Sequence, residues 1–427
     1  MSTICLDRTS IWTVLMVIEH RPVVLAIFVL TYAGMAIGRV PGLKLNRVGF
    51  ALLGAICMMV FSGTSADGMV SRVNWPTILL LFGFFVISSQ LQLSGFYGRV
   101  AERVSLFAGK PSRFLLVLMA VTGGLSAFLN HDIICYVFTP VVAAALLRRR
   151  LNPAPFLIGL AISSNIGATA TLVGSAQGIL IGEVAHLGFW RYFLWSAVPV
   201  ALAMAAAYGL VLMAVSRPGP DFAPIDVGEP DVAYPFDRRH TAKGLVILGA
   251  VIALFFTPVP KEIIVLVAAA VHLASPKFRT EDLLALVDWQ ILVLFMSLFI
   301  VTGTFAATGY GESAVRWLEG AGFDPGRPAN EALMTVGLAA LLNNAPAVML
   351  LVKIIPLASP SVAYVLSLAN GFGGNVILTA SVSNIIVVQQ ARRQGIAISF
   401  RDFARIGLPV TAAAVAILVG WVALAGR

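Results

Sequence analysis

Two apolar stretches of about 15 residues each flank a short polar group in the first half of the chain. Residues 115–129 precede Asn130, His131 and Asp132, and residues 133–147 follow them. A helix of that length reaches roughly 22 Å, less than the ~30 Å hydrocarbon core, while both stretches together are too long for one straight span. We therefore predict a re-entrant helical hairpin whose polar tip lies near the middle of the bilayer.

The whole chain has the composition of a polytopic helical membrane protein. Of its 427 residues, 59% are hydrophobic and 11% are charged, whereas soluble domains carry about 25% charged residues. Apolar runs recur from residue 23 to the C-terminus, which excludes a soluble core with a single anchor. These runs lack the ~10-residue alternating segments of barrel strands, so the expected fold class is all-α. We expect no metal site or disulfide, because Cys5, Cys57 and Cys135 lack paired spacing.

The second half of the chain repeats the plan of the first half. An offset of 214 residues relates Asn74 to Asp288, Gly95 to Gly309 and Asn130 to Asn344. Five crossings separate a segment from its repeat when each hairpin counts as none, and an odd number of crossings inverts the second copy. Inverted repeats whose broken helices meet near the bilayer midplane are typical of secondary transporters.

Each half is expected to hold about five spans, an amphipathic stretch, a re-entrant hairpin and a helix broken in its middle. In the first half we place spans at 23–37, 48–62, 76–93 and 193–215, the amphipathic stretch at 94–108, the hairpin at 113–147 and the broken helix at 154–183. In the second half we place spans at 242–256, 263–273, 289–306 and 403–425, the amphipathic stretch at 310–318, the hairpin at 329–355 and the broken helix at 362–390. The chain then divides into a short N-terminal interfacial segment (1–22), membrane repeat 1 (23–215), a cytoplasmic loop (216–241) and inverted membrane repeat 2 (242–427).

The basic residues predict the orientation. One side of the membrane would hold most of them, including Arg47, Arg99, Arg103, Arg148 and Arg238, and the other side a scatter such as Lys261 and Arg316. The basic-rich side is cytoplasmic by the positive-inside rule, so both termini lie outside. The net charge of +9 then reflects basic loops. The expected partners are the lipid bilayer and a small-molecule or ion substrate, with no nucleic acid, and the expected location is the bacterial inner membrane.

Both broken helices are rich in small and polar residues at the break. The N-terminus of a half-helix carries partial positive charge and free N–H groups that suit an anion, while exposed C-terminal carbonyls suit a cation. Close helix packing is the alternative use of small residues in membranes. The predicted substrate-binding residues are Asn130, His131, Thr169, Thr171, Ser175, Asn344, Asn375, Thr379, Ser381 and Asn384. The predicted coupling-ion residues are Asn130, Asp132, Gly167, Asn343 and Gly373, with Na⁺ as a candidate coupling ion and no other cofactor.

Asp132 is the sharpest single candidate. An ionisable group between two apolar stretches is rare and by default functional, so this carboxylate is expected to bind a cation or carry a proton. The alternative is a tip that reaches the interface, where Asp132 only caps the second helix of the hairpin. His131 beside it either titrates near neutral pH or makes a structural hydrogen bond.

At these residues the chain resembles the Ion Transporter superfamily, which contains divalent anion:sodium symporters, arsenite permeases and sodium/proton antiporters. The resemblance covers nearly the whole chain from Val23 and is carried by the hairpin tips, by Ser163-Ser164-Asn165-Ile166-Gly167-Ala168-Thr169-Ala170-Thr171-Leu172-Val173-Gly174 and by Gly373-Gly374-Asn375. It implies scaffold helices around transport domains, often in a dimer, with elevator-like movement. Dicarboxylate symporters carry Ser-Asn-Thr at both tips. Here the tips read Asn-His-Asp and Asn-Asn-Ala-Pro, which look more like the arsenite permease branch.

The function expected from these features is secondary active transport of a small anion, an inorganic oxyanion or a carboxylate, coupled to H⁺ or Na⁺. A Na⁺/H⁺ antiporter of the same fold is the alternative. A channel is less favoured, because two closed hairpins argue against an open pore. We expect no enzymatic activity, since the sequence has no pair of intramembrane aspartates, no His-Glu-x-x-His and no Gly-x-Ser-x-Gly.

Overall fold

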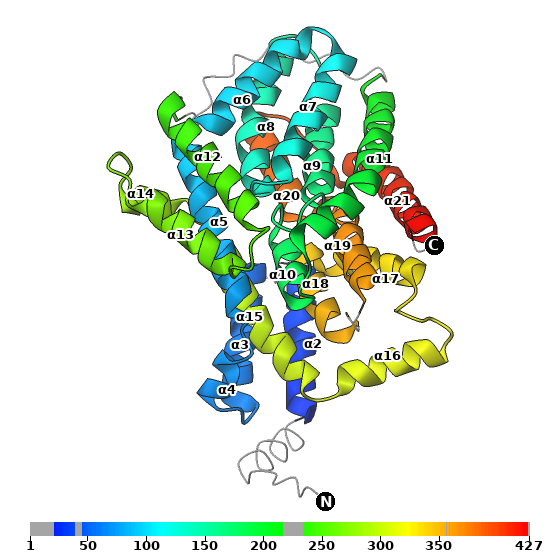
Figure 1. Cartoon of the computed structure of the whole chain (residues 1–427). Helices are drawn as coiled ribbons and strands as arrows, with labels where there is room; N and C mark the ends of the chain where they lie inside the picture. Colours follow the sequence, from blue (N-terminus) through cyan, green and yellow to red (C-terminus); the bar gives the residue numbers. More distant parts are fainter. Residues whose placement is uncertain (1–20, 39–44, 217–233, 356, 358, 426–427) are drawn as a thin grey trace, which may run out of the picture.

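The computed structural model describes residues 21–38, 45–216, 234–355, 357 and 359–425, and within these ranges it contains helices and no strands (Figure 1). The first half holds α2 (Arg21–Ile37), α3 (Arg47–Phe61), α4 (Ala66–Val70), α5 (Trp75–Leu93), α6 (Phe96–Ser105), η1 (Leu106–Gly109), α7 (Pro111–Ser126), α8 (His131–Leu147), α9 (Ala154–Ala168), α10 (Ala176–Val184) and α11 (Phe189–Val215). The second half holds α12 (Arg238–Leu254), α13 (Lys261–Leu273), α14 (Thr280–Ala285), α15 (Trp289–Ala306), α16 (Tyr310–Gly320), α17 (Pro328–Leu342), α18 (Asn344–Ile354), α19 (Pro360–Gly373), η2 (Leu378–Ala380), α20 (Val382–Arg393) and α21 (Phe400–Ala425). Nearly all of the predicted interfacial segment and most of the predicted cytoplasmic loop lie outside the described residues.

Equivalent helices in the two halves begin with the same local chemistry. The side chain of Asn74 caps α5 by accepting from the amide of Thr77, and Asp288 caps α15 in the same way, each at 3.0 Å. Gly95 and Gly309 precede α6 and α16 at φ of 73° and 78°, a left-handed conformation that glycine adopts without steric cost. α6 lies at the top of the molecule in Figure 1, and α16 lies at the bottom.

The predicted hairpins and broken helices are present as helix pairs. Residues 127–130 join α7 to α8, and Asn343 joins α17 to α18. The first broken helix consists of α9 and α10 with residues 169–175 between them, and the second consists of α19 and α20 with η2 in the interruption. Both tips lie within the protein, since the side chains that start α8 and α18 are buried.

Four of the described helices are long and apolar enough to cross a bilayer: α5, α11, α15 and α21. The predicted spans at 48–62 and 263–273 correspond to α3 and α13, which have 15 and 13 residues. They reach roughly 22 Å and 20 Å, short of the ~30 Å hydrocarbon core.

The helices pack in two groups, which we name the scaffold and the core. The scaffold consists of α2–α5 and α12–α15, in which α5 packs along α13 and α3 along α15, so each long helix lies against a short helix of the other half. The core consists of α7–α11 and α17–α21, in which α7 packs on α9, α17 on α19 and α11 on α21. The groups meet where α5 and α15 lie against α10 and α18.

Candidate functional site

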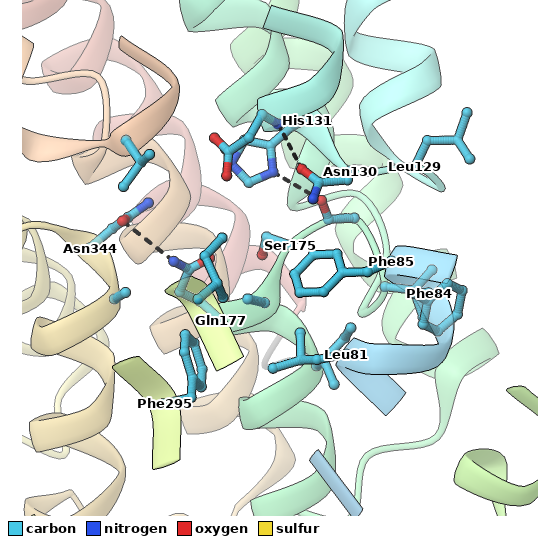
Figure 2. Close-up of a pocket in the computed structure, with 18 of the residues that line it drawn as sticks. Leu81, Phe84, Phe85, Leu129, Asn130, His131, Ser175, Gln177, Phe295 and Asn344 are labelled. Carbon is cyan, nitrogen blue, oxygen red and sulfur yellow. Dashed lines mark hydrogen bonds and ion pairs between the residues drawn. The ribbon is translucent and has the colours of Figure 1, made fainter. Parts of the chain in front are cut away.

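A cavity with an empty volume of about 720 Å³, including its open mouth, lies where the core meets the scaffold. The core supplies its polar wall from the two hairpin tips and the two broken helices, including Asn130, Ser175 and Asn344. The scaffold supplies an apolar wall from α5 and α15: Leu81, Phe84, Phe85, Ile87, Ile291, Leu294 and Phe295. Figure 2 shows the amides and the imidazole gathered on one side, opposite the aromatic rings.

Four helix N-termini open onto this cavity. α8 starts after Asn130, α10 after Ser175, α18 at Asn344 and α20 after Ser381, and all four residues line the cavity. Each helix start carries roughly half a positive charge together with N–H groups that have no partner inside the helix. The described lining residues include no lysine or arginine, so these helix ends are its main source of positive potential.

Side-chain caps hold the starts of α8 and α10 in place. The Oδ1 atom of Asn130 accepts from the amide of Asp132 at 2.8 Å, and the hydroxyl of Ser175 accepts from the amide of Gly178 at 3.0 Å. Because Asn130 caps α8, the carboxylate of Asp132 is not used as a cap and is available for another partner.

Asn343 fixes the second tip. Its backbone angles, φ 80° and ψ 156°, fall in a region that is almost restricted to glycine, so the surrounding contacts must hold it there. The Oδ1 atom faces the amide of Ala345 at 3.4 Å, and the Nδ2 atom donates to the carbonyl of Thr379 at 3.1 Å. Asn343 therefore joins the second hairpin to the break in the second broken helix.

Each hairpin tip is bound to the broken helix of the other half. The hydroxyl of Ser383 on α20 donates to Asp132 on α8. On the opposite side, Gln177 on α10 donates to the Oδ1 atom of Asn344 on α18 at 3.4 Å (Figure 2). The polar wall is thus built from both halves together.

His131 lies beside Asp132 in a defined orientation. Its Nδ1 atom is 3.1 Å from the carbonyl of Gly174, which can only accept, so Nδ1 carries a hydrogen. Its Nε2 atom is 3.7 Å from the Oδ1 atom of Asp132. The side chains of both residues are about nine-tenths buried and line the cavity, so the imidazole and the carboxylate form a compact pair in its wall.

Behind the cavity wall, a buried amide cluster joins the two broken helices. The Nδ2 atom of Asn165 on α9 donates to the Oδ1 atoms of Asn375 at 2.9 Å and Asn384 at 3.0 Å, and its Oδ1 atom accepts from Ser381 at 3.1 Å. Asn384 also donates to the carbonyl of Gly374 at 2.7 Å. All four side chains of the cluster are at most 3% exposed.

The structure divides the predicted site residues into two groups. Those that line the cavity are Asn130, His131, Asp132, Ser175, Asn344 and Ser381. Those that lie outside its lining are Gly167, Thr169, Thr171, Asn343, Gly373, Asn375, Thr379 and Asn384. The two threonines of the first break bond backbone carbonyls, since Thr169 donates to that of Ile166 on α9 and Thr171 to that of Ala127 in the first hairpin.

Gly167 and Gly373 are packing contacts. A Cβ atom on Gly167 would clash with the backbone of Gly123, so α9 lies directly on α7. A Cβ on Gly373 would approach Val336 and Ala339 of α17 to 3.1 and 3.2 Å. The helix-packing alternative for small residues therefore describes both positions.

Sequence reasoning missed Asn165, Gln177, Ser383 and the aromatic wall. Asn165 follows Ser163 and Ser164 at the end of an apolar run, two residues before Gly167, and this polar group is a usable signal. Gln177 and Ser383 follow the two breaks, and their partners stand in the other half of the chain. Phe84 and its aromatic neighbours resemble any other apolar side chains of a span, and only the structure shows which of them face the core.

The fold and the cavity together define a polytopic helical membrane transporter, in agreement with the predicted superfamily. The chain belongs to the family described as Citrate transporter (CitMHS), whose model matches residues 24–369. An uncharacterized transporter of Mycobacterium tuberculosis (strain ATCC 25618 / H37Rv) is 29% identical over 427 residues, which cover 91% of this chain and 95% of the relative. The magnetosome protein MamN of Magnetospirillum gryphiswaldense is 28% identical over 63% of this chain and 64% of its own length.

The YdaH transporter of Alcanivorax borkumensis is a solved structure with a similar fold. It matches with a TM-score of 0.58 and 15% identity, over 95% of this chain and 97% of that chain. The predicted all-α membrane fold is therefore confirmed.

Proposed function

We propose that this protein is a secondary active transporter that moves a small anion, an inorganic oxyanion or a carboxylate, with H⁺ or Na⁺ as the coupling ion. The observation that carries the proposal is the meeting of four helix N-termini on one cavity. Four half-charges amount to roughly +2, against the single carboxylate of Asp132. The description of the family, Citrate transporter, makes citrate the first substrate to test.

The coupling ion is proposed to bind at Asp132. The carboxylate accepts from Ser383 and lies 3.7 Å from the Nε2 atom of His131. This pair can share one proton, which would suit H⁺ coupling, and the carboxylate alone can ligate Na⁺. Because the site lies in the same cavity as the anion-binding helix ends, ion and anion would stabilise each other when both are bound.

We further propose that the two halves are inverted relative to each other, with the α6 end cytoplasmic and both termini outside. The support is that the equivalent helices α6 and α16 lie at opposite ends of the molecule (Figure 1), and that basic residues gather near α6. A bacterial inner-membrane location and a homodimer are proposed from the resemblance alone.

The function is tested by uptake into liposomes that contain the purified protein. Radiolabelled citrate is supplied with an imposed pH gradient, a Na⁺ gradient or neither, and succinate, sulfate, phosphate and arsenite are then tested as competitors. Accumulation above equilibrium that depends on one of the gradients supports coupled transport. The anion proposal would be contradicted if the folded protein showed no gradient-dependent uptake of citrate and none of the other compounds competed.

A Na⁺/H⁺ antiporter is the second candidate, favoured by one observation. Asp132 is the one acidic side chain among the described residues that line the cavity, and a single carboxylate can exchange Na⁺ for H⁺. Dequenching of a pH dye on addition of Na⁺ or Li⁺, without any added anion, would identify this activity.

A further inference from the structure

Two basic residues occupy equivalent positions in the two halves of the scaffold. α3 begins at Arg47 and α13 begins at Lys261. The offset of 214 residues that relates the hairpin tips Asn130 and Asn344 also relates these two. Both were expected to be charges at the membrane surface, but their side chains contact the core.

Lys261 binds the far end of the first broken helix. Its Nζ atom lies 3.3 Å from the Oε1 atom of Glu183, near the end of α10, and donates to the carbonyl of Leu187 at 3.2 Å. The side chains of Glu183 and Lys261 are 16% and 28% exposed. The pair is therefore screened less than a surface ion pair, and it joins the scaffold to the core.

Arg47 binds the break in the second broken helix. Its Nε atom donates to the carbonyl of Met35 at 3.2 Å, and its Nη2 atom lies 3.5 Å from the carbonyl of Thr379. That carbonyl also accepts from Asn343 at the second hairpin tip. Arg47 therefore connects α2 and α3 of the scaffold to both polar elements of the second half of the core.

The ion pair between Lys261 and Glu183 lies beside the central cavity. A smaller cavity, with an empty volume of about 260 Å³, lies between α10 and the scaffold and is lined by Glu183, Lys261 and Phe255. It shares Val173 and Ile179 with the central cavity. A relative movement of core and scaffold at this place would open the wall between the two cavities.

We propose that Arg47 and Lys261 are a matched pair of positioning residues that tether the core to the scaffold. Each residue binds the broken helix that belongs to the other half of the chain. Each must release its core partner when the core moves. The inference rests on the proposed transport function, because only a transport cycle requires this movement. The test below needs no substrate, so a failure of citrate uptake leaves its outcome unaffected.

The test of Lys261 measures thiol accessibility in a variant whose native cysteines are replaced by serine. Val173 is 9% exposed in the native protein. A cysteine at this position should react with a small maleimide faster when the wall between the two cavities opens. We expect Lys261→Gln and Glu183→Gln each to raise the labelling rate by about threefold or more, since each removes a partly buried ion pair. The double exchange Lys261→Glu with Glu183→Lys should restore the slow rate.

Lys277→Gln is the matched control. Lys277 also pairs with a carboxylate, that of Asp237, but both members belong to the scaffold. The bond from Lys277 and the amide of His240 hold the pKa of Asp237 well below its usual range, so this control pair stays charged at the pH of the assay. An unchanged rate in Lys261→Gln, an equal rise in Lys277→Gln, or no recovery in the double exchange would overturn the proposal for Lys261.

Arg47 is tested in the same way with Leu378→Cys, which precedes the contacted carbonyl of Thr379. Arg47→Gln is expected to raise its labelling about threefold, and Arg47→Lys to retain most of the protection. Arg72→Gln is the control, because Arg72 donates to the carbonyl of Gly303 within the scaffold. Equal labelling in Arg47→Gln and the parent protein, or an equal rise in Arg72→Gln, would show that Arg47 is not a tether.

Discussion

At the scale of single residues, Asp132 combines features that rarely occur together. Its carboxylate is buried, stands at a helix N-terminus and accepts from Ser383, a residue of the other half. A buried carboxylate that is held by one hydroxyl at the wall of a cavity is a candidate ion site.

We expect Asp132→Asn to fold and to lose the dependence of transport on its coupling gradient. The amide has the size of the carboxylate and can still accept from Ser383, so the free energy of unfolding should change little. Gradient-driven uptake should fall by about tenfold, which corresponds to about 1.4 kcal/mol of ion interaction. The measurement is uptake with and without the gradient, together with the thermal midpoint.

Wild-type gradient dependence in Asp132→Asn would remove Asp132 from the coupling site. Asp324→Asn is a suitable control, because the side chain of this aspartate is 48% exposed and lies outside the cavity lining.

Asn344→Ala is expected to weaken transport by lowering the apparent affinity for the substrate. The change removes the acceptor of Gln177 at a position where Asn344 is only 4% exposed. An unpaired buried amide costs about 1–3 kcal/mol, so substrate affinity should fall by roughly 10- to 100-fold. Asn130→Ala should have a similar effect through the first tip. The measurement is the concentration dependence of uptake.

Asn330→Ala provides the comparison for the amide, because its side chain bonds the carbonyl of Asp324 away from the cavity. Expression and detergent-extracted yield should match the parent protein in all of these variants. If Asn344→Ala transported at the wild-type rate, the second tip would not belong to the substrate site.

The candidate residues were predictable where polarity interrupts an apolar run. Asn130, Asp132 and Asn344 stand out for this reason, and all three line the cavity. Thr169 and Thr171 also interrupt an apolar run, but their hydroxyls bond backbone carbonyls and do not face the cavity. Sequence does not distinguish these uses, because a threonine in a helix break can point either to its own backbone or to a ligand.

At the scale of helices, the close approach of α7 and α9 depends on two glycines. A Cβ atom on Gly167 would clash with the carbonyl oxygen of Gly123. A Cβ atom on Gly123 would lie 3.2 Å from the carbonyl oxygen of Ser163 on α9 and 2.5 Å from Met204 on α11. This contact sets the distance between the first hairpin and the first broken helix. It therefore also sets where the N-termini of α8 and α10 lie relative to each other.

Gly167→Ala is expected to lower the free energy of unfolding by about 1–3 kcal/mol, because the new methyl group meets backbone that cannot rotate away. The measurement is the thermal midpoint in detergent. Gly124→Ala is the matched control on α7, since a Cβ there meets nothing within 4 Å. Similar midpoints for the two variants would mean that α7 and α9 can separate freely.

The order of the helices followed from the sequence, because hydrophobic length and polar interruptions are local properties. The amphipathic stretches at 94–108 and 310–318 correspond to α6 and α16, and both breaks fall within the predicted broken helices. The pairing of α20 with α8 and of α10 with α18 did not follow. A hairpin can pack against the broken helix of its own half or of the other half, and the local sequence pattern is the same in both cases.

At the scale of the whole molecule, the proposed inversion of the two halves predicts on which side of the membrane equivalent residues lie. Glu102 on α6 and Arg316 on α16 are related by the offset of 214 residues, and both are exposed. If the halves are inverted, Glu102→Cys should react with a membrane-impermeant maleimide only from the cytoplasmic side. Arg316→Cys should react only from the outside. The measurement compares intact cells with inside-out vesicles, in a background without native cysteines.

Labelling of both positions from the same side would contradict the inverted arrangement and would also remove the basis for placing both termini outside. Permeabilised cells serve as the control, because both cysteines should then react.

The pairing of each tip with a partner from the other half has a consequence for ancestry. Asp132 needs Ser383, and Asn344 is bound by Gln177. A half-length chain standing alone would lack both of these contacts and the residues that the other half adds to the cavity wall. If the two halves derive from one ancestral chain, a dimer of that chain would have been the smallest unit able to form both contacts, and gene fusion would have made that dimer permanent.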